Sequence, residues 1–128
     1  MSHIPADLKY TREHEWLRIE GDEAVVGITY HAQDQLGEVV FVDLPRVGES
    51  FERDSEFATI ESVKAVSEGY MPVSATVIAI NQDLEGNPEQ VNDDPYGNGW
   101  LVRIKIENTS EINALLDAAA YQKFITEE

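Results

Sequence analysis

The alternation of apolar and polar positions along the chain predicts one domain built mainly of short strands. Alternation with a period of two on both sides of Gly21-Asp22 is typical of a hairpin, because glycine tolerates the backbone of a tight turn. The continuously apolar run at residues 39–42 predicts a buried strand. The strands predicted in this way cover residues 15–20, 23–28, 39–42, 58–62, 65–70, 73–80 and 100–106.

Helical signals are short and lie between or after these strands. Thr29 is a good cap for a helix that ends at Gly37. Residues 83–98 are rich in Asn, Pro and Gly and predict an ordered loop with one or two helical turns. At the C-terminal end, residues 110–126 form the predicted helical segment, with Ser110 as its cap and two apolar stripes. Residues 1–7 are expected to be flexible.

One lysine stands at the centre of two alternating runs. The strands at 58–62 and 65–70 predict a hairpin with Val63-Lys64 at the bend, so the Lys64 side chain is expected to point into water. Lysine carries a primary amine on a flexible stem and is therefore an accessible target for acylation. Only four lysines occur among 25 acidic residues. We interpret Lys64 as an attachment point; the alternative is a lysine that only solubilises the turn.

Composition excludes several classes of function. A chain of 128 residues, 42% hydrophobic, predicts a single domain over residues 1–128. Its net charge of -16 would repel phosphate backbones, so no nucleic-acid partner is expected. The absence of cysteine excludes disulfides, thiolate metal sites and a cysteine nucleophile. No apolar run approaches the roughly 20 residues that cross a bilayer, and no signal peptide is evident.

The histidines and acids do not predict a catalytic or metal site. Adjacent strand residues point to opposite faces, so Glu13, His14 and Glu15 are not expected to converge, either as a metal site or as an acid-base set. His3 and His31 lack metal-ligand spacing. Among so many acids, some pair of carboxylates must lie close by chance. A hydrolase that uses such a pair, and an unmodified acidic interaction module, remain alternatives.

Several segments together resemble the H protein of the glycine cleavage system. Glu61-Ser-Val-Lys64-Ala65 is similar to a lipoyl-attachment motif, whereas biotin carriers usually place methionine on both sides of the lysine. The other similar segments follow in the order of that family, over residues 8–124: Tyr10-Thr-Arg-Glu-His14-Glu15-Trp16, Gly27-Ile-Thr, Ala32 through Pro45, Pro72-Val-Ser74, and Asn92-Asp-Asp-Pro-Tyr-Gly97 through Leu101.

This resemblance implies a carrier rather than an enzyme. The implied fold is mainly β, the barrel-sandwich hybrid of lipoyl and biotinyl domains with short helices and a C-terminal helical segment. Lipoic acid would be joined as an amide to Lys64. The implied partners are glycine decarboxylase, aminomethyltransferase, dihydrolipoyl dehydrogenase, and the lipoate ligase or octanoyltransferase that modifies the lysine. We expect a monomer in the bacterial cytoplasm, without a membrane partner.

The resemblance also implies a cleft that holds the loaded arm. The residues that match this cleft are Glu13, Glu15, Gln35, Ser67 and Glu68, and Glu61 matches the acid that lipoylating enzymes favour. Ala75 and Tyr30 depart from the family, which usually has glycine and commonly aspartate there. At position 75 we favour an ordinary β backbone over a turn with positive φ. A lipoyl carrier, or a lipoate relay, of another pathway is the main alternative function.

Overall fold

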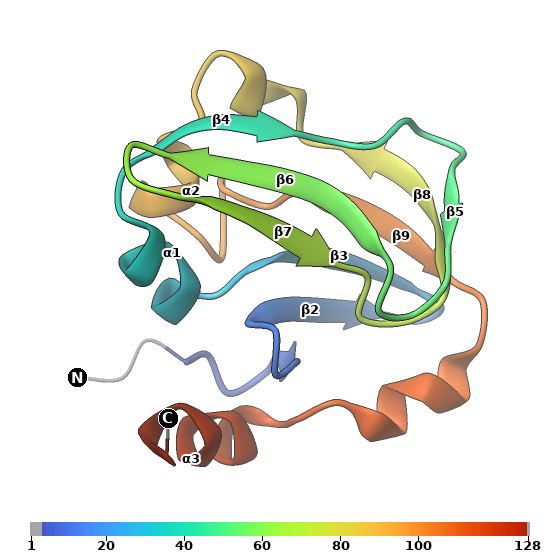
Figure 1. Ribbon diagram of the computed structural model, residues 1–128. Coiled ribbons are helices and arrows are strands. Elements are labelled where there is room, and N and C mark those ends of the chain that lie inside the picture. Colours follow the sequence, from blue (N-terminus) through green and yellow to red (C-terminus); the bar gives the residue numbers. More distant parts are fainter. Residues whose placement is uncertain (1–3, 128) are drawn as a thin grey trace.

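The structure is a computed structural model that describes residues 4–127 as two antiparallel sheets (Figure 1). The larger sheet has the strand order β1-β2-β3-β9-β8-β5, and the smaller has the order β4-β6-β7. The strands are β1 (Lys9–Tyr10), β2 (Glu15–Glu20), β3 (Glu23–Ile28), β4 (Val39–Asp43), β5 (Ser50–Phe51), β6 (Glu56–Ser62), β7 (Val66–Tyr70), β8 (Ala75–Ile80) and β9 (Val102–Ile106). Residues 1–3 of the segment expected to be flexible lie outside the described residues.

The helices are short and lie at the ends and edges of the sheets. They are α1 (Tyr30–Leu36), η1 (Gln82–Glu85), α2 (Gln90–Asp93), η2 (Thr109–Ala114) and α3 (Ala118–Glu127), of which η1 and η2 are 3-10 helices. The Thr29 hydroxyl accepts a hydrogen bond from the Ala32 backbone and caps α1, as predicted. Gly37 ends α1 with φ at 79°, a conformation that favours glycine. The mainly β fold with short helices is confirmed.

The main core lies between the two sheets. In Figure 1 the small sheet of β4, β6 and β7 lies over β2, β3 and β9. Apolar side chains from both sheets fill the space between them, and Leu17, Val77 and Ile104 are fully buried there. Because each fully buried aliphatic side chain stabilises a fold by about 1.5–3 kcal/mol, this layer holds the sheets at a fixed distance.

A second apolar cluster fixes the C-terminal helix against the larger sheet. Tyr10 and Tyr121 stack with ring centroids 4.7 Å apart, and both are fully buried. Trp16 belongs to the same cluster and covers Gly27, where a Cβ atom would lie 2.7 Å from the indole ring. Glycine at position 27 therefore makes room for Trp16. This packing holds α3 against β1 and β2 of the larger sheet.

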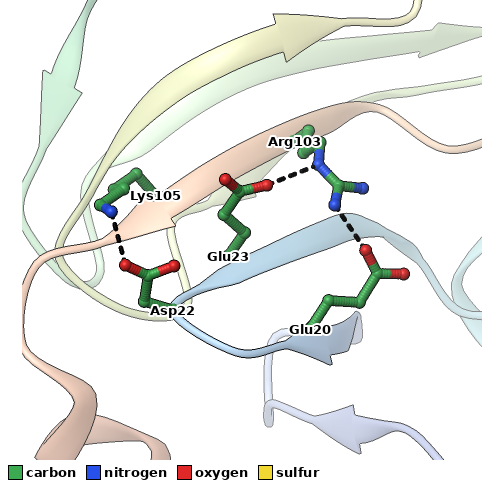
Figure 2. A network of polar contacts seen from close by, with 5 residues as sticks. All are labelled: Glu20, Asp22, Glu23, Arg103 and Lys105. Atoms are coloured by element: carbon green, nitrogen blue, oxygen red, sulfur yellow. Dashed lines mark hydrogen bonds and ion pairs between the residues drawn. The ribbon is translucent and has the colours of Figure 1, made fainter.

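Ion pairs join the exposed faces of neighbouring strands in the larger sheet (Figure 2). The Arg103 guanidinium on β9 pairs with Glu20 and Glu23, and its Nε lies 3.0 Å from the Glu23 carboxylate. Lys105 pairs with Asp22 at the β2–β3 turn. Arg103 and Lys105 lie on the same, less buried face of β9. Exposed pairs of this kind contribute little stability, typically below about 1 kcal/mol.

Two details of the predicted elements are wrong. β4 is not continuously buried, because it is the edge strand of the small sheet and its register with β6 shifts between Val39 and Phe41. Val40 and Phe41 are consequently about half exposed, at 47% and 50%. The predicted helix at 110–126 is interrupted: its first part is the 3-10 helix η2.

The chain leaves η2 in an extended conformation at Leu115, and the backbone of Leu116 then pairs with Tyr10. The N-terminal cap of η2 is Asn108 and not the predicted Ser110. The Asn108 side chain accepts a hydrogen bond from the Ser110 backbone N–H. The N–H and carbonyl groups of Leu116 bond to those of Tyr10 in β1, whereas in a continuous helix they would bond within the helix. Only tertiary structure brings Tyr10 to this position.

Candidate functional site

Lys64 lies at the exposed tip of the hairpin between β6 and β7. Ser62 closes the turn: its backbone N–H donates to the Ala65 carbonyl at 2.8 Å, and its hydroxyl accepts from the Ala65 N–H at 3.0 Å. Val63 and Val66 on either side of this turn are 67% and 62% exposed. The tip therefore holds its own backbone shape while its side chains stay accessible. The hairpin predicted around Lys64 is confirmed.

The tip is also tied to the turn between α1 and β4. The Val63 N–H donates to the Glu38 carbonyl at 3.0 Å, although the two residues are far apart in sequence. The Lys64 stem passes along Gly37, where a Cβ atom would lie 3.4 Å from Lys64 Cε. Gly37 and Glu38, which follow α1, thus position the hairpin tip from which the Lys64 side chain extends.

A cleft of about 230 Å³ opens beside the hairpin. Its two sides come from β7 and from α1, and the start of β2 forms one end. The structure brings together all five residues predicted for the arm cleft, together with seven others. The residues that line the cleft are Glu13, His14, Glu15, Ile28, Ala32, Gln35, Leu36, Ile60, Ala65, Val66, Ser67 and Glu68.

Glu61, like Lys64, is a predicted site residue that does not line this cleft. It lies on β6 and pairs with Val66 of β7 on one side and with Phe41 of β4 on the other. Its position, three residues before Lys64, leaves it on the hairpin that a modifying enzyme must approach. A role in recognition by that enzyme stays a prediction.

Glu15 is the most unusual group in the cleft, because its carboxyl is buried and only 1% of the residue is exposed. Glu15 Oε1 accepts from the Thr11 hydroxyl at 2.7 Å, and Oε2 accepts from the Tyr70 N–H at 3.1 Å. Burial raises the pKa of Glu15 to about 8, against the opposing effect of these two hydrogen bonds. Burial therefore favours the protonated form of this carboxyl group at neutral pH.

The convergence of Glu13, His14 and Glu15 corrects a sequence prediction. β2 begins only at Glu15, and His14 adopts φ of 70°, so the alternation of a strand does not apply before Glu15. The turn at 11–14 is closed by a bond from the His14 N–H to the Thr11 carbonyl, and it places all three residues around the cleft. Within residues 4–127, no group of three or more His, Asp or Glu side chains could hold a metal ion.

Sequence reasoning missed Thr11 and the apolar wall of the cleft. Thr11 orients the Glu15 carboxyl and also accepts from the N–H groups of Glu13 and Glu15, at 3.2 and 3.1 Å. Its place in the segment Tyr10–Trp16 was the available signal. The wall of Ile28, Leu36 and Ile60 comes from three separate elements, and no local pattern brings them together.

Comparison with known proteins decides the family. Residues 8–128 match the family described as Glycine cleavage H-protein. The chain is 57% identical to the "Glycine cleavage system H protein" of Aeromonas salmonicida over the full length of both chains. It is 52% identical to the protein of the same name from Symbiobacterium thermophilum, with 99% of each chain covered.

The chain belongs to the glycine cleavage H-protein family. A crystal structure of a glycine cleavage system H protein from Mycobacterium marinum superposes with a TM-score of 0.86 at 36% identity, and covers 94% of this chain and 97% of that one. The resemblance stated from sequence is therefore confirmed, and the two packed sheets are consistent with the predicted barrel-sandwich.

Glycine cleavage H-proteins are lipoyl carriers, so the site can be tested for its fit to a lipoyl group. Ile28, Leu36 and Ile60 offer an apolar wall suited to an alkyl chain and a dithiolane ring. Lys64 offers the amine for the amide bond, on the hairpin whose residues Ala65 and Val66 line the cleft. The residues present therefore fit the group. Within residues 4–127, no helix is long and apolar enough to span a membrane.

Proposed function

We propose that this chain carries a lipoyl group as an amide on Lys64 and conveys the aminomethyl group of glycine between enzymes. In this proposal glycine decarboxylase loads the arm, aminomethyltransferase unloads it to tetrahydrofolate, and dihydrolipoyl dehydrogenase reoxidises it. The observation that supports it best is the position of Lys64, exposed at a hairpin tip beside a cleft that contains a buried carboxyl group.

The attached group would supply the two sulfur atoms that carry and release the cargo, which this chain without cysteine lacks. The chain's own contribution is position. Tethering the group to one hairpin makes every transfer local and raises its effective concentration at each enzyme. We infer that the chain by itself catalyses no reaction and that turnover requires the partner enzymes.

The cleft residues have separate roles in this proposal. Glu15 accepts a hydrogen bond from the cargo's ammonium and loses its proton as that positive charge arrives. Glu13 and Glu68 lie around the same cleft and add negative potential. The apolar wall limits the access of water, which protects a cargo that hydrolyses to formaldehyde. Gln35 and Ser67 offer neutral hydrogen-bonding groups on the two sides.

Modification of the lysine depends on the hairpin as a shape. We propose that the lipoate ligase or octanoyltransferase recognises the exposed tip together with Glu61. Ser62 fixes the turn through its bonds to Ala65, so the amine is presented on a rigid backbone with a mobile stem. A flexible stem on a rigid base allows the amine to enter the active site of the modifying enzyme, and later allows the attached group to enter those of the partner enzymes.

The proposal is tested by mass spectrometry and by isotope exchange. After incubation with lipoate and lipoate ligase, intact mass and peptide mapping should place one adduct on Lys64. The lipoylated chain should then support exchange of carbon between glycine and bicarbonate by glycine decarboxylase. Lys64→Arg, which keeps the charge but loses the acylatable amine, should abolish both results. Lys123→Arg on α3 is the matched control and should change neither.

An adduct on Lys9, Lys105 or Lys123 in place of Lys64 would contradict the hairpin argument. Equal isotope exchange with Lys64→Arg would contradict the carrier assignment. If the chain is lipoylated on Lys64 but glycine decarboxylase does not use it, the carrier serves another pathway.

A further inference from the structure

The segment Asn92–Tyr96 is part of the sequence resemblance, yet it does not line the cleft. It begins within the last residues of α2, continues beyond that helix, and contacts α1 near both ends of α1. At the C-terminal end of α1, the Asn92 amide donates to Gln33 Oε1 at 3.0 Å and to the Gly37 carbonyl at 2.8 Å. Asn92 Oδ1 accepts from the Val39 N–H at 2.8 Å. One side chain thus bonds the last turn of α1, the residue that ends it and the first residue of β4.

The N-terminal end of α1 is held by Tyr96 of the same segment. Its hydroxyl accepts from the Tyr30 N–H at 3.0 Å, which satisfies a helix donor that has no partner within the helix. The segment is itself anchored, because the Pro95 carbonyl accepts from the indole N–H of the buried Trp16 at 2.9 Å. Asn92 and Tyr96 therefore connect α1 to the rigid part of the fold.

These ties matter because α1 has only seven residues. A helix of this length is unstable alone in water and takes its position from tertiary contacts. Two features of the site depend on that position: α1 supplies Gln35 and Leu36 to the cleft, and the turn after it supplies the Gly37 surface and the Glu38 carbonyl that hold the Lys64 hairpin.

We propose that Asn92 and Tyr96 are positioning residues for the carrier arm: by fixing both ends of α1 they set the width of the cleft and the place of Lys64 beside it. This inference rests on the proposed function, since it assumes that the cleft protects the loaded arm. The Asn92–Tyr96 segment would thus act on the arm although none of its residues lines the cleft.

Asn81 offers a matched control for Asn92. Its amide also donates two hydrogen bonds, in this case both to backbone carbonyls, those of Asn98 and Trp100, at 2.8 Å each, and none of these residues lies on α1. Asn92→Ala and Asn81→Ala therefore remove the same kind of interaction from different places. Tyr96→Phe is a milder second variant, because it keeps the ring and removes the hydroxyl that accepts from the Tyr30 N–H.

The first measurement uses the unmodified chain. Amide hydrogen exchange followed by NMR should show faster exchange of Val63 in Asn92→Ala, by about threefold to tenfold, the factor expected when a hydrogen bond that holds its acceptor in place is lost. In Tyr96→Phe the exchange of Tyr30 should rise. Asn81→Ala should leave both amides unchanged even where its thermal stability falls as much.

The second measurement uses the lipoylated and loaded chain. Release of formaldehyde should be faster in Asn92→Ala than in Asn81→Ala, with lipoylation itself complete in both. Faster release in both variants, in proportion to lost stability, would overturn the proposal. A second result would also overturn it: faster Val63 exchange in Asn92→Ala with an unchanged release rate, in an assay in which Glu15→Gln accelerates release. The cleft would then protect the arm, but the hydrogen bonds of Asn92 to α1 would not be needed for that protection. If Glu15→Gln also has no effect, the proposed cleft function fails, and this inference with it.

Discussion

The exchange of Glu15 for glutamine is the sharpest test of how the cleft holds its cargo. Glutamine has nearly the same shape but cannot become an anion. The protonated form of the Glu15 carboxyl is favoured at pH 7, because burial raises its pKa to about 8. An ammonium that enters the cleft must therefore first cause loss of that proton, and the benefit of the charged pair is reduced by the cost of ionisation.

The two contributions can be compared. A hydrogen bond to a charged group contributes about 1.5–3 kcal/mol, and ionising a carboxyl of pKa about 8 costs on the order of 1 kcal/mol at pH 7, more at pH 6 and little at pH 8. The net holding energy is then near zero at pH 6 and roughly 1 kcal/mol at pH 7. Formaldehyde release should thus be severalfold faster in Glu15→Gln than in the wild type at pH 7, and roughly tenfold faster or more at pH 8.

The assay follows formaldehyde from loaded, lipoylated carrier at pH 6, 7 and 8, with Glu20→Gln as control. Glu20 undergoes the same substitution on the outer face of the larger sheet, where it pairs with Arg103. A ratio of release rates near one at every pH would refute the holding role. A raised ratio that does not depend on pH would refute the argument from burial, since it would mean that Glu15 is ionised throughout.

The unloaded chain gives an independent check on the same group. A carboxyl whose pKa is raised on folding binds its proton more tightly in the folded state, so its contribution to stability is present at acid pH and is lost as pH rises from about 4.5 to about 8. Glu15→Gln does not titrate. Its free energy of unfolding relative to the wild type should therefore increase between pH 5 and pH 8, measured by urea denaturation, whereas Glu20→Gln should show no such trend.

Three further predictions concern the scaffold. Ala75→Gly should lower stability by about 1–2 kcal/mol and leave the lipoylation rate unchanged, because Ala75 is fully buried in β8 and has no positive φ; faster lipoylation would contradict this. Gly27→Ala should cost about 1–3 kcal/mol and shift the fluorescence of Trp16, while Gly86→Ala, with open space around it, should not. Arg103→Gln should cost less than about 1 kcal/mol in urea denaturation, and added salt should shrink that cost.

The sequence by itself determined most of the strands, the cap of α1, the Lys64 hairpin and the family. These features depend on local rules: alternation with a period of two, a threonine before a helix, a glycine after it, and a motif within a few residues of the lysine. The predicted cleft residues came from resemblance, and the structure gathers all five of them around one cleft.

Tertiary structure alone decided what depends on neighbours distant in sequence. β4 is half exposed because it became an edge strand, and the C-terminal helix is interrupted because Leu116 found a partner in Tyr10. Glu15 reads as one acid among 25, and its pKa is raised only because packing removes water around it. Asn92 likewise acquires its role from three groups, on Gln33, Gly37 and Val39, because hydrogen bonds across a fold follow distance in space and not order along the chain.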